Sequence, residues 1–329
     1  MTASDHAPPE KAVRTLGAQA VAPLLLIAFS VALIAFGARL APGFASASNL
    51  FQLLKLASFL GLAAIGQTIV MLTGGIDLSI AWVLTASAVV FTALCNGQDA
   101  NIVPAAAAAL SVGLVTGLVN GFGVVKLRIS PIVMTLAMNN IMLGATLIWT
   151  GGTPSGSSSP LVRSLATGSL GVVPAMVILW CGLAVVTVVA VKYTRGGRIL
   201  LGVGENPRVT FLTGLSNDRT IIAAYVICGF MSSATGILFA AFSGASFLGM
   251  GDQFVLPTIA AVVLGGTSMF GGRGGYGGTM AAVVFTTILT TVLVIGNIPQ
   301  GVRSIVFGVA VLAAIMSQRF LTRRDERDQ

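Results

Sequence analysis

The chain has 329 residues, of which 55% are hydrophobic and 9% charged, whereas soluble domains carry about a quarter charged residues. A soluble fold cannot bury that much apolar surface, so the composition predicts an integral membrane protein. The net charge of +8 does not indicate nucleic acid as a partner, because the basic residues are not gathered into one patch interleaved with aromatic side chains.

The apolar residues form long blocks, each close to the roughly 20 residues that a helix needs to cross the hydrocarbon core. The strict alternation of a porin-like barrel, in segments of about 10 residues, is absent. We therefore expect an all-α membrane protein with about ten transmembrane helices. They are placed near residues 19–39, 50–72, 79–95, 103–125, 130–150, 172–192, 220–244, 255–270, 279–296 and 302–320. The first block is too long for a signal peptide and is expected to be a first span.

Ten spans put both ends of the chain on one side of the membrane. With that assignment Arg39, Lys55, Arg163 and Arg303 fall on the outer side, and the other 14 of the 18 basic residues fall on the inner side. Because Lys and Arg favour cytoplasmic loops, both termini are expected in the cytoplasm. The expected organisation is an N-terminal cytoplasmic tail (residues 1–17), a transmembrane domain (18–320) and a C-terminal cytoplasmic tail (321–329).

A polar break follows the second predicted span, where residues 73–79 read Thr-Gly-Gly-Ile-Asp-Leu-Ser. Gly74 and Gly75 permit an interruption of the helix. In one interpretation Asp77 and Ser79 cap the next helix, because side-chain oxygens there satisfy unpaired N–H groups. In the other, the broken helix lines a translocation path, since irregular backbone at membrane depth is tolerated only inside protein or beside a cavity.

Several uncharged polar residues fall within the predicted spans, namely Gln67, Asn120, Asn139, Asn140 and Trp149. Such residues either join helices through hydrogen bonds or contact a hydroxylated solute. Nine of the ten acidic residues fall in predicted tails or loops, and only Asp77 lies near a span. Proton-coupled carriers usually keep ionisable residues within their spans, so the energy for transport is expected to come from another protein.

Two predicted connections differ from the rest in length. The outer loop 151–171 is polar and carries no run of charge. Residues 193–220 form the longest cytoplasmic stretch between spans and include Arg195, Arg198, Glu205 and Arg208. This cytoplasmic segment is the best candidate for docking another protein.

A second glycine-rich break, residues 264–275, reads Leu-Gly-Gly-Thr-Ser-Met-Phe-Gly-Gly-Arg-Gly-Gly. It contributes Gly265, Gly266, Gly271, Gly272 and Arg273 as further pathway or helix-break residues. No Gly-Lys-Ser/Thr follows these glycines, so they do not predict a nucleotide-binding loop.

Neither a metal site nor a catalytic site is predicted. His6 is the only histidine, which argues against a Ser-His-Asp triad. Cys95, Cys181 and Cys228 lie far apart in apolar runs without CxxC spacing. A membrane-embedded enzyme is therefore the least favoured class.

With these motifs the chain resembles the permease subunits of bacterial sugar ABC importers, the group that contains the ribose, xylose and galactose systems. The resemblance covers nearly the whole chain. It is carried by Asn49-Leu50, by the glycine break at 74–79, by Gly204-Glu205-Asn206-Pro207 and by the second glycine motif at 265–274.

The resemblance implies a multi-pass protein of the bacterial inner membrane with a type II-like importer architecture, in which spans two to five and seven to ten form a repeat of opposite topology. It implies a second permease subunit, normally a copy of the same chain, surrounded by membrane lipid. It also implies a cytoplasmic ATPase that binds ATP and Mg²⁺, which this chain does not, and a periplasmic or extracellular solute-binding protein. The substrate implied is a small sugar.

By the same resemblance, residues near Gly204–Leu215 would be the ATPase-coupling element, with Gly204, Glu205, Asn206, Pro207, Arg208 and Gly214 as its motif residues. Relatives tend to have an Ala-Ala pair before the final glycine, whereas this chain reads Val-Thr-Phe-Leu-Thr over 209–213. Two other functions remain open: a facilitator or channel that works without an ATPase, and an ABC permease for nucleosides or branched-chain amino acids.

Overall fold

The computed structural model describes the backbone of residues 10–327 and the side chains of residues 24–316. The elements in chain order are α1 (Glu10–Leu40), α2 (Ala47–Leu72), α3 (Ile80–Cys95), the 3-10 turn η1 (Asp99–Asn101), α4 (Ile102–Val125), α5 (Pro131–Thr150), α6 (Pro160–Thr167), β1 (Ser169–Leu170), β2 (Val173–Pro174), α7 (Ala175–Tyr193), α8 (Arg195–Glu205), α9 (Pro207–Leu212), α10 (Asn217–Ser243), α11 (Asp252–Leu264), α12 (Tyr276–Ile295) and α13 (Gln300–Arg327). The expected all-α architecture is confirmed apart from the short antiparallel pair β1–β2.

Six helices in the described part are long and apolar enough to cross a membrane: α2, α4 with its η1 turn, α5, α7, α10 and α12. Four shorter apolar stretches lie at Leu24–Leu40, Ile80–Cys95, Asp252–Leu264 and Gln300–Met316. Each of the ten segments expected from the sequence coincides with one of these ten stretches. The chain is thus a multi-pass helical membrane protein.

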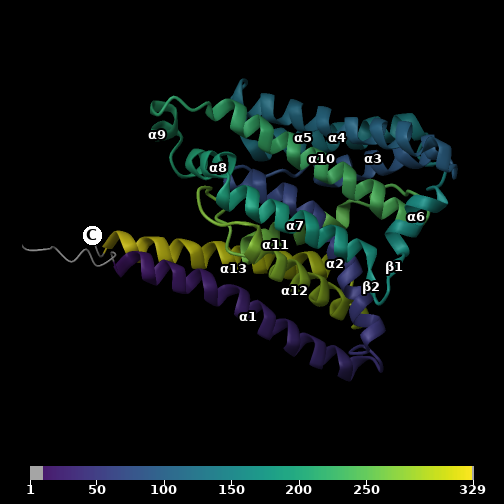
Figure 1. Cartoon of the computed structure of the whole chain (residues 1–329), viewed down its shortest axis with the longest axis horizontal. Helices are drawn as coiled ribbons and strands as arrows, with labels where there is room; N and C mark the ends of the chain where they lie inside the picture. The colour runs from purple at the N-terminus through teal and green to yellow at the C-terminus, as the bar shows by residue number, and fades with distance from the viewer. Residues whose placement is uncertain (1–9, 328–329) are drawn as a thin grey trace, which may run out of the picture.

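Helix α2 lies at the centre of the molecule. It packs against α10 on one side and against α11 and α12 on the other, and Figure 1 shows α3, α4, α5 and α10 on one side of it and α1, α12 and α13 on the other. In the most apolar stretch of α2, 78% of the residues are buried, whereas only 17% are buried in the corresponding stretch of the peripheral α5. The helix that precedes the first glycine break is therefore enclosed by protein.

Close helix approach depends on glycine where α4 crosses α10. A Cβ on Gly113 would overlap Gly229 O, and a Cβ on Gly229 would overlap Gly113 O. Small residues at such crossings let helix backbones approach in lipid, where no hydrophobic force drives helices together.

The helices run between two ends of the molecule. One end, which we call the α8–α9 end, carries α8, α9 and the beginning of α10; the other, the α6 end, carries α6 and the β1–β2 pair (Figure 1). The described start of α1 and the described end of α13 both lie at the α8–α9 end.

The structure differs from the sequence expectations at several boundaries. The span expected at 255–270 ends at Leu264, because the two glycines that follow allow the chain to turn away. Two of the nine acidic residues expected in tails or loops, Asp218 and Asp252, instead lie in the first turns of α10 and α11. Helix α1 begins at Glu10, inside the expected tail 1–17, of which residues 1–9, with His6, lie outside the described residues.

Candidate functional site

The first break lies between α2 and α3. Helix α2 ends at Leu72, and Gly74 adopts a left-handed conformation with φ of 81°, which glycine accepts without a steric penalty. The N–H groups of Gly74 and Gly75 return to Met71 O and Val70 O at 2.9 and 3.2 Å. The last turn of α2 is thereby closed, and residues 73–79 are freed from the helix.

The second break lies between α11 and α12. Thr267 N donates to Val262 O at 3.2 Å, and Ser268 N donates to Arg273 O at 2.9 Å. Gly271 and Gly272 have φ of 87° and 74°. Residues 265–275 therefore form a tight loop with internal hydrogen bonds, whereas Arg273 points to the exterior as an exposed side chain.

Residues 193–220, expected as a long cytoplasmic segment, contain two short helices. The hydroxyl of Thr194 accepts the N–H of Gly197 and caps α8. Asn206 separates α8 from α9, and its Oδ1 accepts the N–H groups of Arg208 and Val209, both at 3.1 Å. Pro207 occupies the first turn of α9, where a missing N–H costs nothing. The Gly-Glu-Asn-Pro motif therefore ends one helix and caps the next.

The two breaks and the α8 terminus meet at one point, which we call the glycine junction and define as Leu72, Gly74, Gly204, Gly271 and Gly272. Gly272 N donates to Leu72 O at 3.0 Å. A Cβ on Gly204 would overlap both of these atoms. A Cβ on Gly271 would lie 2.8 Å from Gly74 N and 2.9 Å from Gly204 O. Three distant segments thus touch backbone to backbone, with no room for a side chain between them.

A buried polar cluster holds the other side of the first break. Asp77 is 2% exposed, Ser79 1% and Asn120 0%. Asp77 Oδ1 accepts from Ser79 N at 2.8 Å and from Ser79 Oγ at 2.6 Å, and Asn120 Nδ2 donates to Ser79 Oγ at 2.9 Å. Asp77 thus bonds the backbone N–H of Ser79, the residue that precedes α3. The Ser79 side chain makes no capping bond to α3.

Helices α5 and α10 complete the enclosure of this cluster. Thr135 Oγ1 accepts the N–H of Leu78 at 3.0 Å and can donate to Ile76 O at 3.3 Å. From α10, the Cys228 thiol bonds the Asp77 carboxyl, and Tyr225 is fully buried.

The remaining polar residues predicted in spans are scattered. Asn139 Oδ1 accepts the N–H of Trp82 at 3.4 Å, whereas Asn140 is exposed on α5 and bonds only within its own helix, to Leu136 O. Trp149 is 54% exposed, and Gln67 is fully buried with neither amide atom paired to a described residue. The structure therefore brings Asn120 into the site with Asp77 and Ser79, but not Asn140.

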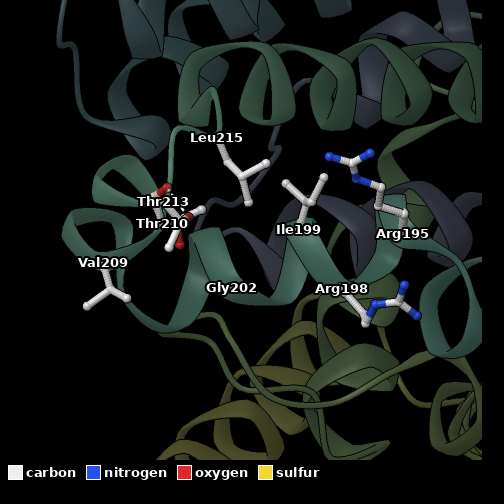
Figure 2. Close-up of a pocket in the computed structure, with 8 residues that line it drawn as sticks. All are labelled: Arg195, Arg198, Ile199, Gly202, Val209, Thr210, Thr213 and Leu215. Atoms are coloured by element: carbon white, nitrogen blue, oxygen red, sulfur yellow. Dashed lines mark hydrogen bonds between the residues drawn. The ribbon is translucent and has the colours of Figure 1, made fainter.

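A groove of about 480 Å³ opens at the α8–α9 end, between α8, α9 and the loop that follows α9. Figure 2 shows Ile199 and Leu215 facing each other across it, with Arg195 and Arg198 extending to different sides. No carboxylate in the described part of the chain forms an ion pair with either arginine. The groove thus combines an apolar floor with a positive rim.

Beside the groove, α9 exposes three apolar side chains: Val209 is 55% exposed, Phe211 69% and Leu212 78%. Exposed apolar clusters on a polar end of a protein mark sites of protein interaction. Glu205, Arg208 and Gly214 are also exposed at this end, and Gly214 ends the turn after α9 with φ of 79°.

Sequence reasoning missed Leu72, Thr135, Tyr225 and Cys228. Three of these are apolar or weakly polar residues in uniform spans, and Thr135 resembles many hydroxyl residues that bond their own helix, so nothing in the sequence distinguished them. Among the side chains of residues 24–316, no three His, Cys, Asp or Glu residues gather as metal ligands would.

Comparison with known proteins places the chain in a family. Residues 49–316 match the family described as "Branched-chain amino acid transport system / permease component". The ribose import permease protein RbsC of Escherichia coli K12 is 32% identical over 295 residues, covering 88% of this chain and 91% of that protein. No solved structure matches the chain.

Two further relatives show similar coverage. The autoinducer 2 import system permease protein LsrC of Enterobacter sp. (strain 638) is 33% identical over 88% of this chain and 85% of that protein. RbsC of Bacillus subtilis 168 is 30% identical over 84% and 87%. The chain therefore belongs to the permease-component family of transport systems, in the part of it that includes sugar ABC importer permeases.

Proposed function

We propose that this chain is the membrane-spanning subunit of an ATP-binding cassette importer and forms the path by which a monosaccharide enters the cell. Its relatives are named for the import of ribose and of autoinducer 2, which favours a sugar over the branched-chain amino acids in the family description. The observation that carries the mechanism is the glycine junction, because it joins a partner-facing helix pair to both breaks in the apolar helices.

The partner proposed at the α8–α9 end is a cytoplasmic ATPase, which would bind ATP and Mg²⁺ on its own residues. The exposed apolar side chains of α9 and the arginine-rimmed groove supply a surface that a protein of complementary shape and negative charge would cover. Docking there would make α8 move with the ATPase, and α8 ends at Gly204 against both breaks. Rigid-body motion of packed elements is a known means of switching.

The topology proposed has ten spans with both termini in the cytoplasm of a bacterium and the protein in its inner membrane. The described start of α1 and the described end of α13 lie at the α8–α9 end, in agreement with this assignment. The four shorter apolar stretches would then be spans completed by adjoining residues. The transmembrane domain 18–320 would contact lipid and a second copy of the chain.

The pathway proposed runs beside the two breaks, because interrupted helices at membrane depth line cavities or lie inside protein. A solute-binding protein outside the cell would deliver the sugar at the α6 end. In this account Asp77, Ser79 and Asn120 support the wall of the path, since each is bonded within the protein.

Copurification tests the proposal. The chain, solubilised in mild detergent from its native membrane, should retain an ATPase that mass spectrometry identifies, and ATP should drive sugar uptake when both are reconstituted with the binding protein. If liposomes containing this chain alone transported sugar down its gradient at the same rate, the facilitator would replace the importer. Uptake of leucine or a nucleoside instead of any sugar would retain the importer and change its substrate.

A further inference from the structure

The carboxyl group of Asp77 lies among neutral groups only. The titratable side chains that face it, Tyr225 and Cys228, both come from α10, and the groups contributed by the other elements packed around it are Ser79, Asn120 and Thr135. No Lys, Arg or His in the described part of the chain pairs with it. An ionised carboxylate in this place would be a buried charge without a counter-ion, which is strongly unfavourable.

The hydrogen bonds around Asp77 leave one acceptor without a donor. Oδ1 of Asp77 accepts twice from Ser79, and Ser79 Oγ accepts from Asn120 Nδ2. Oδ1 of Asn120, on the same amide, has no partner although it is fully buried. The hydroxyl of Tyr225, which also faces the cluster, has no partner either. Unpaired buried polar groups are costly, and a charged carboxylate would add a further cost to this enclosed cluster.

We propose that Asp77 is a neutral carboxylic acid in the folded protein and acts in that form as a positioning residue, holding the first break against α3 and α4. Its Oδ1 accepts from both groups of Ser79, and its protonated oxygen carries an O–H instead of a charge. The neutral acid removes the uncompensated charge while it keeps both bonds from Ser79. This inference goes beyond the transport function and does not depend on which solute is carried.

A neutral Asp77 predicts different outcomes for two substitutions at this position. Asp77→Asn preserves the shape and supplies an acceptor and a donor but can never be charged, so the variant should keep uptake and thermal stability within about twofold and a few degrees of the parent. Asp77→Ala removes the acceptor for two Ser79 groups and should lower uptake at least about tenfold. If Asp77 is ionised, Asp77→Asn should lose as much uptake and thermal stability as Asp77→Ala.

Infrared spectroscopy of the purified full-length chain in lipid nanodiscs gives a readout that a merely structural role would not move. The parent should show the carbonyl stretch of a protonated carboxyl at neutral pH, the band should disappear in Asp77→Asn, and it should persist in Asp218→Asn, which changes an exposed acid. A parent spectrum containing only carboxylate bands at neutral pH would overturn the proposal. A titration of the parent needs no variant: if the protonated carboxyl band is lost on raising the pH before pH 7 is reached, the proposal is also overturned.

Discussion

The N–H of Gly272 donates to the carbonyl of Leu72 at 3.0 Å, and so joins the loop before α12 to the last residue of α2. Gly204, at the end of α8, lies so close to both atoms that a Cβ there would overlap them. A displacement of α8 therefore acts directly on the backbone of both breaks. Any side chain at this point would separate the partner-facing helices from the helices proposed to line the path.

The close approach at Gly272 predicts a specific stability loss. Gly272→Ala would place a Cβ 2.5 Å from Glu205 Cα and would also strain a backbone with φ of 74°. We expect a loss of about 1–3 kcal/mol from overpacking, in addition to the cost of the left-handed conformation. The measurement is the thermal midpoint of the purified chain in detergent.

Gly266→Ala is the matched control for that substitution. Gly266 also has a positive φ, 89°, but a Cβ there meets nothing within 4 Å. It should pay only the conformational cost, about 1 kcal/mol. Equal midpoints for the two variants would mean that the junction is not tightly packed at Gly272.

The exposed face of α9 predicts the contact with the ATPase. Phe211→Ser combined with Leu212→Ser should reduce the ATPase retained in copurification by at least about tenfold, since apolar anchors dominate interfaces. Both side chains are largely exposed, so membrane insertion and the thermal midpoint should not change.

Leu170→Ser with Val172→Ser is the corresponding control at the α6 end, where the two side chains are 69% and 73% exposed. This pair should leave ATPase retention at the parental value. Loss of retention in both double variants would point to a general defect, and loss in neither would place the ATPase elsewhere.

A buried hydrogen-bond chain predicts the effect of removing one hydroxyl group. Trp180 Nε1 donates to Tyr276 Oη at 2.7 Å, and Tyr276 Oη donates to Gly61 O at 2.7 Å. Tyr276→Phe leaves a donor and an acceptor unpaired in the core and should cost about 1–3 kcal/mol of stability. Tyr193→Phe, at a side chain that is 64% exposed, should cost nothing measurable in the same thermal assay.

Much of the fold could be predicted from the sequence because lipid requires long apolar helices. All ten expected segments coincide with apolar helical stretches, and the errors fall at their ends, as at Leu264. The motifs at 74–79, 204–207 and 265–274 were also recognised. Their convergence could not be predicted, because glycine has no side chain whose chemistry would reveal a partner.

In the buried polar cluster, the residues could be predicted but their contacts could not. Asp77, Ser79 and Asn120 were each noticed for their polarity, but the role of Thr135 depends on the way α5 crosses the break. The bounds of α8 and α9 could not be predicted either, since their short amphipathic pattern lies in a segment rich in glycine and charge. Contacts between distant segments depend on tertiary packing, which the sequence pattern of a single segment does not predict.

If the glycine junction couples ATP hydrolysis to the path, Gly204→Ala should uncouple the two. The assembled complex, with ATPase and binding protein, is reconstituted in liposomes, and sugar uptake is measured per ATP hydrolysed. Gly196→Ala, in the same helix but outside the groove lining, is the control, because Thr194 Oγ1 would lie 3.7 Å from the added Cβ. We expect Gly204→Ala to retain its ATPase but to lower uptake per ATP at least about tenfold, as overpacking of the junction should, while Gly196→Ala matches the parent. Equal coupling ratios in the parent and both variants would show that the junction does not couple hydrolysis to uptake.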